Sequence, residues 1–318
     1  MRRKGMIRFF SRPFRFAICF SAAVALLFTY AMLETFVLPR EMDVARPPKV
    51  SGARREADAR TEDGSPQAAP APTLSATTVP TISELSYSDD NISITIETVR
   101  LYGTTVHIAD VRASSPEYIK TAFAQGKYGR NIKETTSGIA MENNAILAVN
   151  GDYYGFTADG YVLRNGTLYR TSSGADALVM DDDGDFHIVR EEDIADTSSL
   201  WQVWSFGPAL INDGAILVDA NSEVSGRHSV SNPRTAIGQI EPLHYIFLVS
   251  EGRTGDEDGL TLLKLAQILA SRGCIVAYNF DGGGSSAMWF NGTLVNAPTT
   301  DGKRIQEREV SDIVYIGY

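Results

Sequence analysis

An uncharged run near the N-terminus constrains this chain more than any other feature of its sequence. The 18 residues from Phe16 to Leu33, FAICFSAAVALLFTYAML, would rise about 27 Å as a helix, close to the roughly 30 Å hydrocarbon core of a bilayer. Residues 1–15 hold six basic side chains and no acidic one. By the positive-inside rule, the sequence predicts a basic cytoplasmic segment at 1–15, a transmembrane signal anchor at 16–38 and an exported body.

A cleaved signal peptide is the alternative. The apolar region of a signal peptide usually has about 7–15 residues and is followed by a small-residue cleavage site. Here the run is longer, and the segment ETFVLPREMD that follows it contains no such site. The sequence therefore favours an uncleaved single-pass anchor in a bacterial cell membrane, with the body periplasmic or extracellular. Cleavage would instead make the protein secreted.

Residues 39–80 contain few large apolar side chains. Their Pro-, Ala- and Ser-rich composition, as in SPQAAPAPTLSATTVP, is unable to bury a core. We expect a disordered Pro/Ala-rich linker that holds the body away from the membrane. The folded body then spans residues 81–318, a length that one domain can accommodate.

Charge and cysteine content narrow the possible partners and cofactors. The formal net charge is −10, and residues 61–318 carry 17 basic and 34 acidic side chains, which argues against nucleic acid as a partner. Cys19 lies in the apolar run and Cys274 is the only cysteine of the body, so an intradomain disulfide is excluded. No His or Cys cluster demands a metal, and we expect neither a metal nor a cofactor.

Short strands joined by tight turns dominate the body. YVLRNGTLYR and MWFNGTLVN place Asn-Gly between apolar runs, the strongest short hairpin signal, and LVMDDDGDFHIV and ALINDGAILVD turn through Asp-Gly. Helices are few. We expect one in SSPEYIKTAFAQ, where Ser115 is the cap and Pro116 starts the first turn, a short one in ETTSGIAMENN, and the clearest one from Asp258 to Gly273.

The last of these helices joins two apolar strands. HYIFLVS precedes it and IVAYNF follows it, which predicts a β-α-β crossover near the C-terminus and hence a parallel pair. The predicted class is α+β, with a mixed, mostly antiparallel sheet, several hairpins and a few covering helices.

Polar residues interrupt the apolar pattern where strands end. They occur in AVNGDYYGF, VSEGRTG and NFDGGGSS, and also in the turn SNPRTAIG before a strand. Ligands tend to bind beyond the carboxyl ends of strands joined by crossovers, so we expect Glu251 and Asp281 to share one rim. These four stretches supply the candidate site residues Asn150, Asp152, Arg234, Glu251, Arg253, Asp281, Gly282, Gly283, Gly284, Ser285 and Ser286.

Each of these residues has a purely structural alternative. An Asp-Gly after a strand is often only a turn, Gly-rich stretches often mark bulges, and Arg234 could form a structural ion pair. GGGSS lacks the Lys-Ser/Thr ending of a P-loop and the Gly-x-Ser-x-Gly spacing of a nucleophile elbow. Three consecutive glycines nevertheless lose much chain entropy on folding, so bare backbone must be needed there for a tight bend or a close ligand.

Several long motifs resemble those of the phosphodiester glycosidase family. They are NGDYYGF, NPRTAIG, GLTLLKLAQILASRGC and AYNFDGGGSSAMWFNGTLVNAP, and the resemblance runs from about Ile139 to Tyr318. The final segment SDIVYIGY resembles the terminal strand of the family and follows Arg308. The resemblance implies a hydrolase acting on a sugar-1-phosphodiester such as that of N-acetylglucosamine. Bacterial members are often labelled exopolysaccharide biosynthesis proteins.

Two positions depart from the pattern of that family. Glu251-Gly252-Arg253 stands where Asp-Gly-Arg is usual, and Lys264 stands where a glutamate often follows the start of the helix. The first departure keeps the charge but lengthens the side chain by one carbon. Both argue against an identical substrate preference.

The implied chemistry explains why these residue types would be needed. Cleavage at the anomeric carbon of a sugar-1-phosphodiester passes through an oxocarbenium-like transition state, so positive charge grows on the sugar and negative charge on the departing phosphate. Carboxylates beside the ring and arginines near the phosphate stabilise these charges. We predict Asp281 as nucleophile or base with Asp152 as its partner, Glu251 as a further carboxylate, and Arg234 and Arg253 as phosphate ligands.

The remaining candidates would bind the substrate. The three glycines would let backbone N–H groups approach a phosphate or a sugar hydroxyl. Aromatic side chains near the motifs are candidates either for stacking on a sugar face or for the core. The polar candidates in this group are Asn150, Ser285, Ser286 and, by the resemblance, Arg308, and the aromatic ones are Tyr153, Tyr154 and Trp289.

Two other functional classes stay open. The body could be a non-catalytic glycan-binding module of the envelope that uses the same arginines and tyrosines. It could also be a serine hydrolase of acylated polysaccharide, but Ser285 or Ser286 would then need a histidine. The body offers only His107, His187, His228 and His244, whose placement in the sequence suggests no triad.

Overall fold

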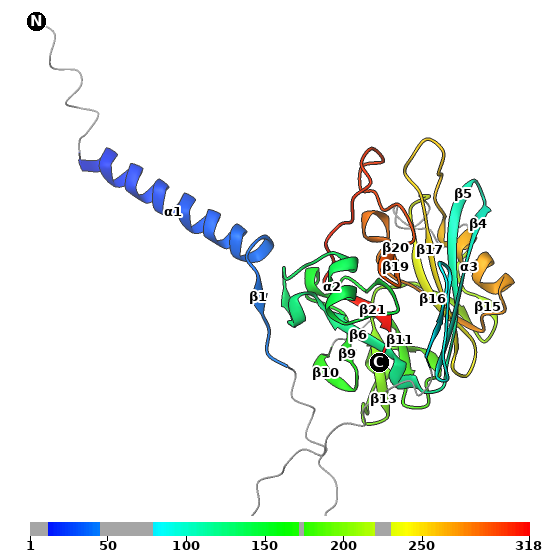
Figure 1. The fold of residues 1–318 in the computed structure, drawn as a ribbon. Helices are drawn as coiled ribbons and strands as arrows, with labels where there is room; N and C mark the ends of the chain where they lie inside the picture. Colours follow the sequence, from blue (N-terminus) through cyan, green and yellow to red (C-terminus); the bar gives the residue numbers. More distant parts are fainter. Residues whose placement is uncertain (1–11, 45–78, 172–174, 220–229) are drawn as a thin grey trace, which may run out of the picture.

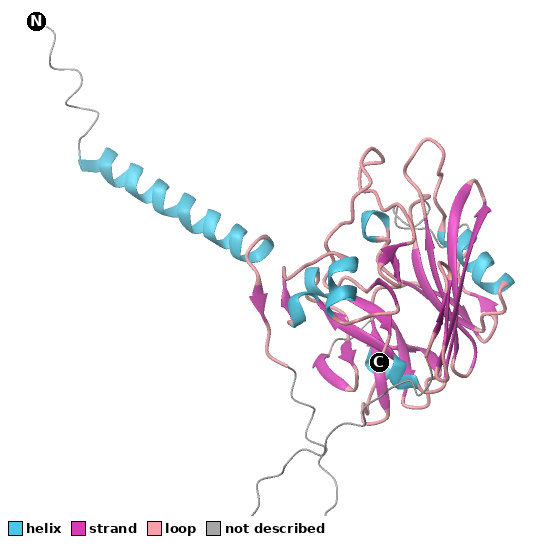
Figure 2. Cartoon of the chain, viewed as in Figure 1, coloured by secondary structure: helices cyan, strands magenta, loops and turns pink. Residues whose placement is uncertain are grey.

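A computed structural model of the protein describes residues 12–44, 79–171, 175–219 and 230–318. Strands dominate the body, as Figure 1 and Figure 2 show, and three α-helices accompany them within the described residues. All strand pairs in the described sheets are antiparallel, which confirms the predicted α+β class. The three α-helices are α1 (Arg12–Phe36), α2 (Thr136–Glu142) and α3 (Leu262–Ser271).

The largest sheet has nine strands and is built around the long hairpin of β4 and β5, to which β17 adds on the other side. Its strands, in spatial order, are β15 (Ala215–Ile216), β14 (Ala209–Asn212), β18 (Val276–Asn279), β16 (Thr235–Glu241), β17 (His244–Ser250), β5 (Thr104–Ala113), β4 (Ile92–Leu101), β3 (Ser86–Ser88) and β2 (Thr81–Ile82).

Two further sheets of five strands each complete the body. The first has the order β20 (Thr293–Leu294), β19 (Met288–Phe290), β8 (Leu147–Asn150), β21 (Asp312–Ile316) and β6 (Ile119–Phe123). The second has the order β10 (Thr167–Arg170), β9 (Val162–Arg164), β13 (Leu200–Trp204), β11 (Asp176–Asp181) and β12 (Phe186–Arg190).

One apolar core joins the three sheets. Phe247 of the nine-stranded sheet, Val149 and Val314 of the first five-stranded sheet, and Leu178 and Trp204 of the second all belong to it and are fully buried. The outer face of the nine-stranded sheet is covered by α3, and that of the first five-stranded sheet by α2. Each sheet therefore buries an apolar face, which is the packing that stabilises a layered domain.

The predicted hairpins are present. Asn165-Gly166 joins β9 to β10, Asn291-Gly292 joins β19 to β20, and Asp213-Gly214 joins β14 to β15. Both residues of each turn have positive φ, the conformation that favours Asn, Asp and Gly in two-residue hairpin turns. The fourth predicted hairpin forms from β11 and β12.

The predicted crossover differs from expectation in one respect. Helix α3 does connect β17 to β18, but β16 lies between these two strands and pairs antiparallel with both. No parallel pair therefore forms, because the hairpin partner β16 and strand β5 already occupy both edges of β17. Strands β17 and β18 still run in the same direction, so the residues that follow them, Glu251 and Asp281, lie at the same edge of the sheet.

Two of the three helices predicted in the body differ from what the structure shows. The segment after Ser115 forms only the 3-10 turn η1 (Pro116–Tyr118) and then strand β6, because its apolar residues alternate into the core of the sheet. Helix α3 begins later than Asp258, at Leu262, where the side chain of Thr261 accepts a hydrogen bond from the N–H of Lys264. The short helix in ETTSGIAMENN is present as α2.

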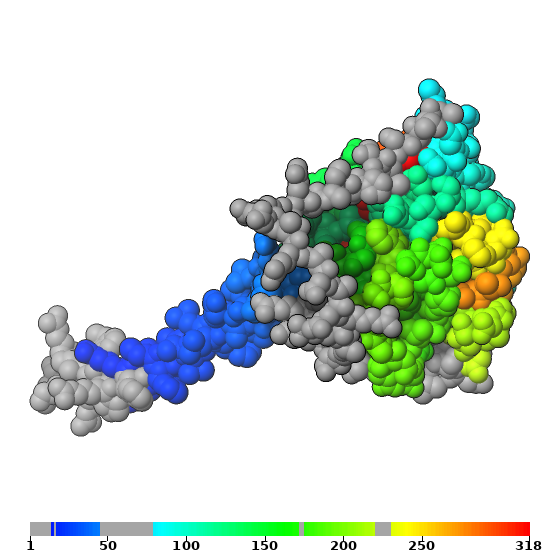
Figure 3. Space-filling view, turned by 90° about the horizontal axis from the view of Figure 1, so that it is seen from below, coloured from blue at the N-terminus to red at the C-terminus, as the bar shows by residue number. Residues whose placement is uncertain are grey.

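The N-terminal segment is attached to the body directly after α1. Strand β1 (Arg40–Glu41) pairs with β7 (Gly129–Arg130), although the sequence placed residues 39 onward in a disordered linker. Figure 3 shows α1 projecting from the body with its C-terminal end toward it. Residues 45–78 of the expected linker and residues 1–11 lie outside the described residues.

Candidate active site

The glycine-rich loop carries the chain from one sheet to another. Strand β18 belongs to the nine-stranded sheet and β19 to the first five-stranded sheet, and residues 280–287 connect them through the 3-10 turn η5 (Gly283–Ser285). The end of β8 lies beside this loop, since Asn150 Nδ2 donates to the Asp281 carbonyl at 2.7 Å and Asp281 N–H to the Gly151 carbonyl at 3.4 Å. Asp281 is thus fixed where two sheets meet.

The carboxylate of Asp281 faces Arg308. Arg308 Nη2 lies 3.1 Å from Asp281 Oδ2, and the Asp281 side chain is 13% exposed against 39% for Arg308. Burial raises the pKa of Asp281, while Arg308 and hydrogen bonds from the Ser285 hydroxyl and the Gly282 N–H oppose that rise. The result is a largely desolvated carboxylate whose negative charge is held by three neighbouring donors.

Arg308 also organises the loop around Asp281. Its Nε donates to Ser285 Oγ at 2.8 Å, and its Nη2 donates to the same oxygen at 2.6 Å and to the Gly282 carbonyl at 3.2 Å. Ser285 is therefore bonded to Arg308 and to the Asp281 carboxylate, and not to a histidine. Ser286 is buried, and its Oγ has no hydrogen-bond partner among the described residues. No contact therefore assigns Ser286 a role in the site.

The three glycines make room for protein groups. A Cβ on Gly283, whose φ is +64°, would lie 2.6 Å from Arg253 Nη2, and a Cβ on Gly284 would lie 2.1 Å from Thr300 Oγ1. A Cβ on Gly282 would approach the Pro233 carbonyl at 2.9 Å. The loop needs bare backbone to seat these groups, and contact of its N–H groups with a substrate stays a prediction.

Arg253 lies over this loop. Its Nε donates to Asn232 Oδ1 at 3.1 Å and its Nη1 to the Thr300 carbonyl at 2.9 Å. Burial and the nearby charge of Arg308 lower the pKa of Arg253, and Asp281 opposes that change. Arg253, Arg308 and Asp281 therefore form one electrostatic group.

Arg234 and Asn150 position the backbone around the site. Arg234 is 7% exposed, and its guanidinium donates to the backbone carbonyls of Leu260 and Val230, each at 3.0 Å. Asn150 Oδ1 accepts from Thr235 Oγ1 at 2.7 Å in addition to the bond that its amide makes to Asp281. These contacts give Arg234 a structural role, and the phosphate contact that the sequence suggested stays a prediction.

Asp152 is directed away from Asp281. Its carboxylate is 1% exposed, lies 2.8 Å from Arg164 Nη2 and accepts the N–H of Ser205 at 2.9 Å. Arg164 also binds Asp312 at 3.1 Å, so two carboxylates share one buried guanidinium. We call Asp152, Arg164 and Asp312 the buried cluster. The predicted pairing of Asp152 with Asp281 is replaced by this cluster.

Glu251 makes a separate set of contacts at the same edge. Its Oε1 accepts the Ala297 N–H at 2.7 Å and lies 3.4 Å from His107 Nε2. His107 Nδ1 lies 3.0 Å from Thr98 Oγ1. The Glu251 carboxylate is therefore occupied by a main-chain donor and a histidine rather than by Asp281 or an arginine.

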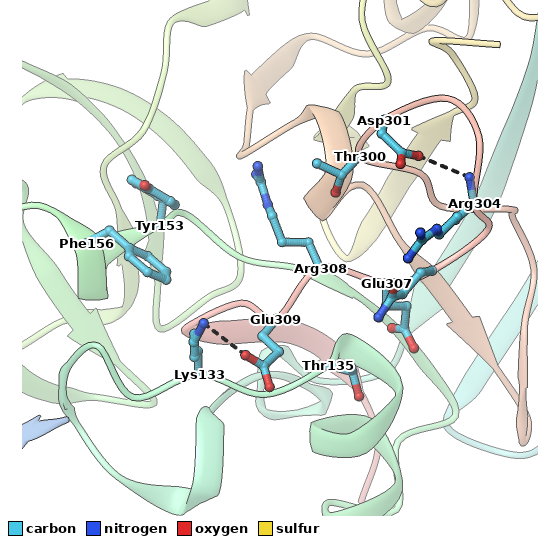
Figure 4. Close-up of a pocket in the computed structure, with 11 residues that line it drawn as sticks. Lys133, Thr135, Tyr153, Phe156, Thr300, Asp301, Arg304, Glu307, Arg308 and Glu309 are labelled. Carbon is cyan, nitrogen blue, oxygen red and sulfur yellow. Dashed lines mark hydrogen bonds and ion pairs between the residues drawn. The ribbon is translucent and has the colours of Figure 1, made fainter. Parts of the chain in front are cut away.

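A cavity of about 720 Å³ opens in front of Arg308. Figure 4 shows Tyr153 and Phe156 on one side, Thr300 and Arg304 on the other, and Arg308 between them. Tyr153, whose φ is +69°, stacks on Phe156 with ring centroids 4.5 Å apart. The cavity thus has an aromatic wall, a cationic centre and charged residues along its rim; Asp281 contacts Arg308 but is not among the residues that line the cavity.

Several residues of this region were not identified from the sequence. Arg164 and Asp312 lie in ordinary strand patterns, and only the lone charge before the apolar run of SDIVYIGY could have signalled Asp312. Phe156 and Lys133 line the cavity; Phe156 closes the motif NGDYYGF but was not named as a candidate, and Lys133 belongs to no motif. Among the described residues, no group of three or more His, Cys, Asp or Glu side chains could hold a metal ion.

Comparisons with known proteins place this geometry in context. A family model described as phosphodiester glycosidase matches residues 143–317. The SPbeta prophage-derived uncharacterized protein YomE of Bacillus subtilis (strain 168) is 28% identical over 204 residues, which make up 60% of this chain and 31% of that protein. The chain therefore spans about a third of the length of this curated relative.

Two solved structures share the fold. The zebrafish N-acetylglucosamine-1-phosphodiester alpha-N-acetylglucosaminidase catalytic domain, auto-inhibited by its pro-peptide, superposes with a TM-score of 0.58 at 23% identity, covering 71% of this chain and 83% of that one. A hypothetical protein from Synechocystis gives a TM-score of 0.51 at 15% identity, covering 71% and 62%.

Proposed function

Because the chain belongs to the phosphodiester glycosidase family, we propose that it is a membrane-anchored, exported hydrolase that releases a sugar from a sugar-1-phosphodiester. An N-acetylglucosamine-1-phosphodiester in envelope or exopolysaccharide glycans is the substrate that fits best. The observation that carries the proposal is the contact between the largely buried carboxylate of Asp281 and Arg308, which is 39% exposed and lines an open cavity.

The cavity offers complementary surfaces for the two halves of such a substrate. A sugar ring has an apolar face that packs on aromatic side chains, and Tyr153 and Phe156 supply a stacked pair on one wall. A phosphate carries negative charge, and Arg308 presents a guanidinium that is 39% exposed. Arg304 and Lys133 also line the cavity, but acidic residues line it too and Lys133 pairs with Glu309 at 3.1 Å, so Arg308 is the cation on which the proposal depends.

The reaction requires one bond to break and one to form. The bond between the anomeric carbon and the phosphate oxygen breaks, the phosphate monoester leaves with the bonding electrons, and a water oxygen becomes bonded to the anomeric carbon. The phosphate is a good leaving group, so strong acid catalysis is not needed. Asp281 would stabilise the developing oxocarbenium charge and act as nucleophile or base, and Arg308 would stabilise the phosphate.

Helix α1 supports the proposed membrane attachment. Residues 17–36 form a helix that is long and apolar enough to cross a bilayer, and its apolar stretch is not buried against the rest of the structure. The basic residues at the N-terminus favour an orientation in which the body lies outside the cytoplasm. The anchor and the body together fit an enzyme of the bacterial cell surface.

The test uses the full chain in detergent with the methyl phosphodiester of α-N-acetylglucosamine-1-phosphate, and NMR follows the free sugar and its first anomer. We expect release by the parent protein and a loss of about 10²–10⁴-fold in Asp281→Asn. Asp196→Asn is the matched control and should retain full activity. Asp196 is exposed, and its carboxylate accepts hydrogen bonds only from its own turn, through Ser198.

The outcomes separate the alternatives. Retained glycan binding without turnover in the parent protein would favour a non-catalytic binding module. A serine hydrolase would be labelled by a fluorophosphonate at Ser285 or Ser286, and the contacts argue against this: the described histidines, His107, His187 and His244, bond to carboxylates and not to either serine. His228 lies outside the described residues.

The rate should also depend on pH in a defined direction. Ionised Asp281 is the active form for a nucleophile or base, and burial raises the pKa of this carboxyl. The rate should therefore fall as the solution is acidified, starting above the range of an ordinary aspartate. A pH profile of kcat/KM for the same methyl phosphodiester measures this, and a rate unchanged down to pH 4 would contradict it.

A further inference from the structure

The end of the apolar helix is fastened to the body by a compact joint. Asn131 Nδ2 donates to the carbonyls of Thr35 and Leu38, both at 3.2 Å, and so satisfies carbonyls at the helix end that have no partner within the helix. Strand β1 then pairs with β7, and the Met42 N–H donates to the Tyr128 carbonyl at 3.0 Å.

A charged contact and an apolar one strengthen this joint. Lys127 Nζ lies 2.5 Å from Glu41 Oε1, and the Met42 side chain packs on the cluster of Tyr128 and Tyr154. Only Val37, Leu38 and Pro39 separate α1 from β1. Three residues reach at most about 10 Å, so the body has to lie within that distance of the end of the helix.

The same joint also supports the wall of the cavity. The N–H of Asn131, the residue that caps the helix, donates to the Gly155 carbonyl of η3 (Tyr154–Phe156) at 3.2 Å. Phe156 at the end of η3 lines the cavity, and so does Lys133, two residues beyond Asn131. One residue thus connects the membrane helix to the aromatic wall through direct hydrogen bonds.

This arrangement has a consequence for where the site lies. A helix that crosses a bilayer ends at the lipid–water interface, and α1 ends in the exposed apolar side chains Phe36, Val37 and Leu38. The cavity wall is linked to that end by two hydrogen-bonded steps and not by a long flexible segment. The connection contrasts with the expected linker, which would hold the body away from the membrane.

We infer that the cavity opens beside the bilayer surface and that the substrate is a sugar-1-phosphodiester whose other ester group is a lipid held in the same membrane. This inference rests on the proposed function. Confinement to one surface raises the effective concentration of such a substrate at the site, whereas a soluble ester has no such advantage.

The activity test compares two esters of α-N-acetylglucosamine-1-phosphate, the methyl ester in solution and a long-chain alkyl ester in vesicles that contain the full-length protein. The key variant inserts six Gly/Ser residues between Leu38 and Pro39, which adds about 20 Å of reach. The matched control places the same insertion between residues 60 and 61, within the expected linker. The body sequence is identical in all three proteins.

We expect the insertion after Leu38 to lower turnover of the lipid ester about tenfold and to leave turnover of the methyl ester within about twofold. The control insertion should change neither. If the parent protein hydrolyses the methyl ester but the insertion after Leu38 leaves lipid-ester turnover unchanged, the inference is overturned and the proposed function stands. If the parent hydrolyses neither ester, the proposed function fails and the substrate inferred here fails with it.

A measurement without turnover tests the placement separately. A dye on Lys133→Cys at the cavity rim, in a background without Cys19 and Cys274, should be quenched by lipids with nitroxide headgroups. A dye on Ile216→Cys in β15, an exposed position on the side of the body away from α1 (Figure 1), should be quenched much less. Equal quenching at the two positions, or quenching at Lys133 that survives the insertion after Leu38, would overturn the placement.

Discussion

Two aspartate–arginine pairs in this protein have the same closest distance and opposite surroundings. Arg308 Nη2 lies 3.1 Å from Asp281 Oδ2, and Arg164 Nη2 lies 3.1 Å from Asp312 Oδ2. The first pair is partly exposed at a cavity, whereas the side chains of the second are at most 1% exposed. The accessible pair can exchange protein contacts for substrate contacts, and the buried one can only hold the fold together.

The two pairs are nevertheless mechanically connected. Asp152 of the buried cluster follows Gly151, whose carbonyl accepts the Asp281 N–H and whose own N–H donates to the Asp312 carbonyl. Gly151 also has to be a glycine, because a Cβ there would lie 2.1 Å from Asp312 Oδ1. The buried cluster therefore sets the position of the β8 end, and the β8 end sets the position of Asp281.

The largest effect should follow from breaking the buried cluster. Arg164→Ala leaves two carboxylates buried without their cation, which is expected to cost about 3–5 kcal/mol of unfolding free energy. Arg190→Ala removes an exposed pair with Glu192 at 3.1 Å and should cost at most about 1 kcal/mol. Denaturant unfolding of the full chain measures both, and equal losses would show that burial is not what separates them.

Breaking the accessible pair should affect rate rather than stability. Arg308→Lys keeps the charge but loses the planar fork that spans Asp281 and Ser285, so kcat/KM should fall about 10²–10³-fold. The unfolding midpoint should stay close to that of the parent protein. Arg190→Lys serves as the activity control. A loss of stability comparable to that of Arg164→Ala, with the rate unchanged, would reverse the roles assigned to the two pairs.

The glycine loop beside the accessible pair provides a finer test. Gly283 and Gly126 share a φ of +64°, but a Cβ on Gly283 would meet Arg253 at 2.6 Å, whereas a Cβ on Gly126 has nothing within 4 Å. Both Gly→Ala changes carry the strain of positive φ, about 1–2 kcal/mol. Only Gly283→Ala should also lower kcat/KM by displacing Arg253. If the two variants are equally active, the position of Arg253 does not matter for activity.

Local signals in the sequence predicted much of the fold. The Asn-Gly and Asp-Gly turns act over a few residues, so the hairpins β9–β10, β19–β20 and β14–β15 follow from them. The predictions that failed did so because contacts with distant strands outweighed the local sequence pattern. The segment after Ser115 starts as a helix would, yet its apolar residues are taken into β6, and β16 occupies the edge of β17 that a parallel partner would have needed.

The candidate site shows the same division. Asp281 and Arg253 could be named because they follow two apolar strands that the predicted crossover places in the same direction. The partners of the other two carboxylates could not be named, because they come from distant segments of the chain: Arg164 in β9 binds Asp152, and the Ala297 N–H binds Glu251. Arg234, an arginine in a turn, donates to two backbone carbonyls, and no sequence pattern predicts these contacts.

A further expected effect concerns a single proton in the buried cluster. Two carboxylates share the one charge of Arg164, and burial together with the neighbouring Asp152 raises the pKa of Asp312 to about 7. The folded protein then holds a proton that the unfolded chain releases near pH 4. Its stabilising contribution is fully present below about pH 4 and is lost as the pH rises through about 7, with a slope of at most about 1.4 kcal/mol per pH unit.

Asp312→Asn should remove this dependence, because an amide is neutral at every pH in this range. The unfolding free energy of the variant should stay flatter than that of the parent protein between pH 4 and pH 7, as measured by denaturant unfolding at a series of pH values. Asp196→Asn is a control in which the pH dependence of stability has the opposite sign. Hydrogen bonds lower the pKa of Asp196, so the stabilising contribution of this carboxylate is present above its unfolded pKa and is lost only on acidification. If the slope of Asp312→Asn equals that of the parent protein, Asp312 is ionised when folded, and the cluster carries its full negative charge beside the site.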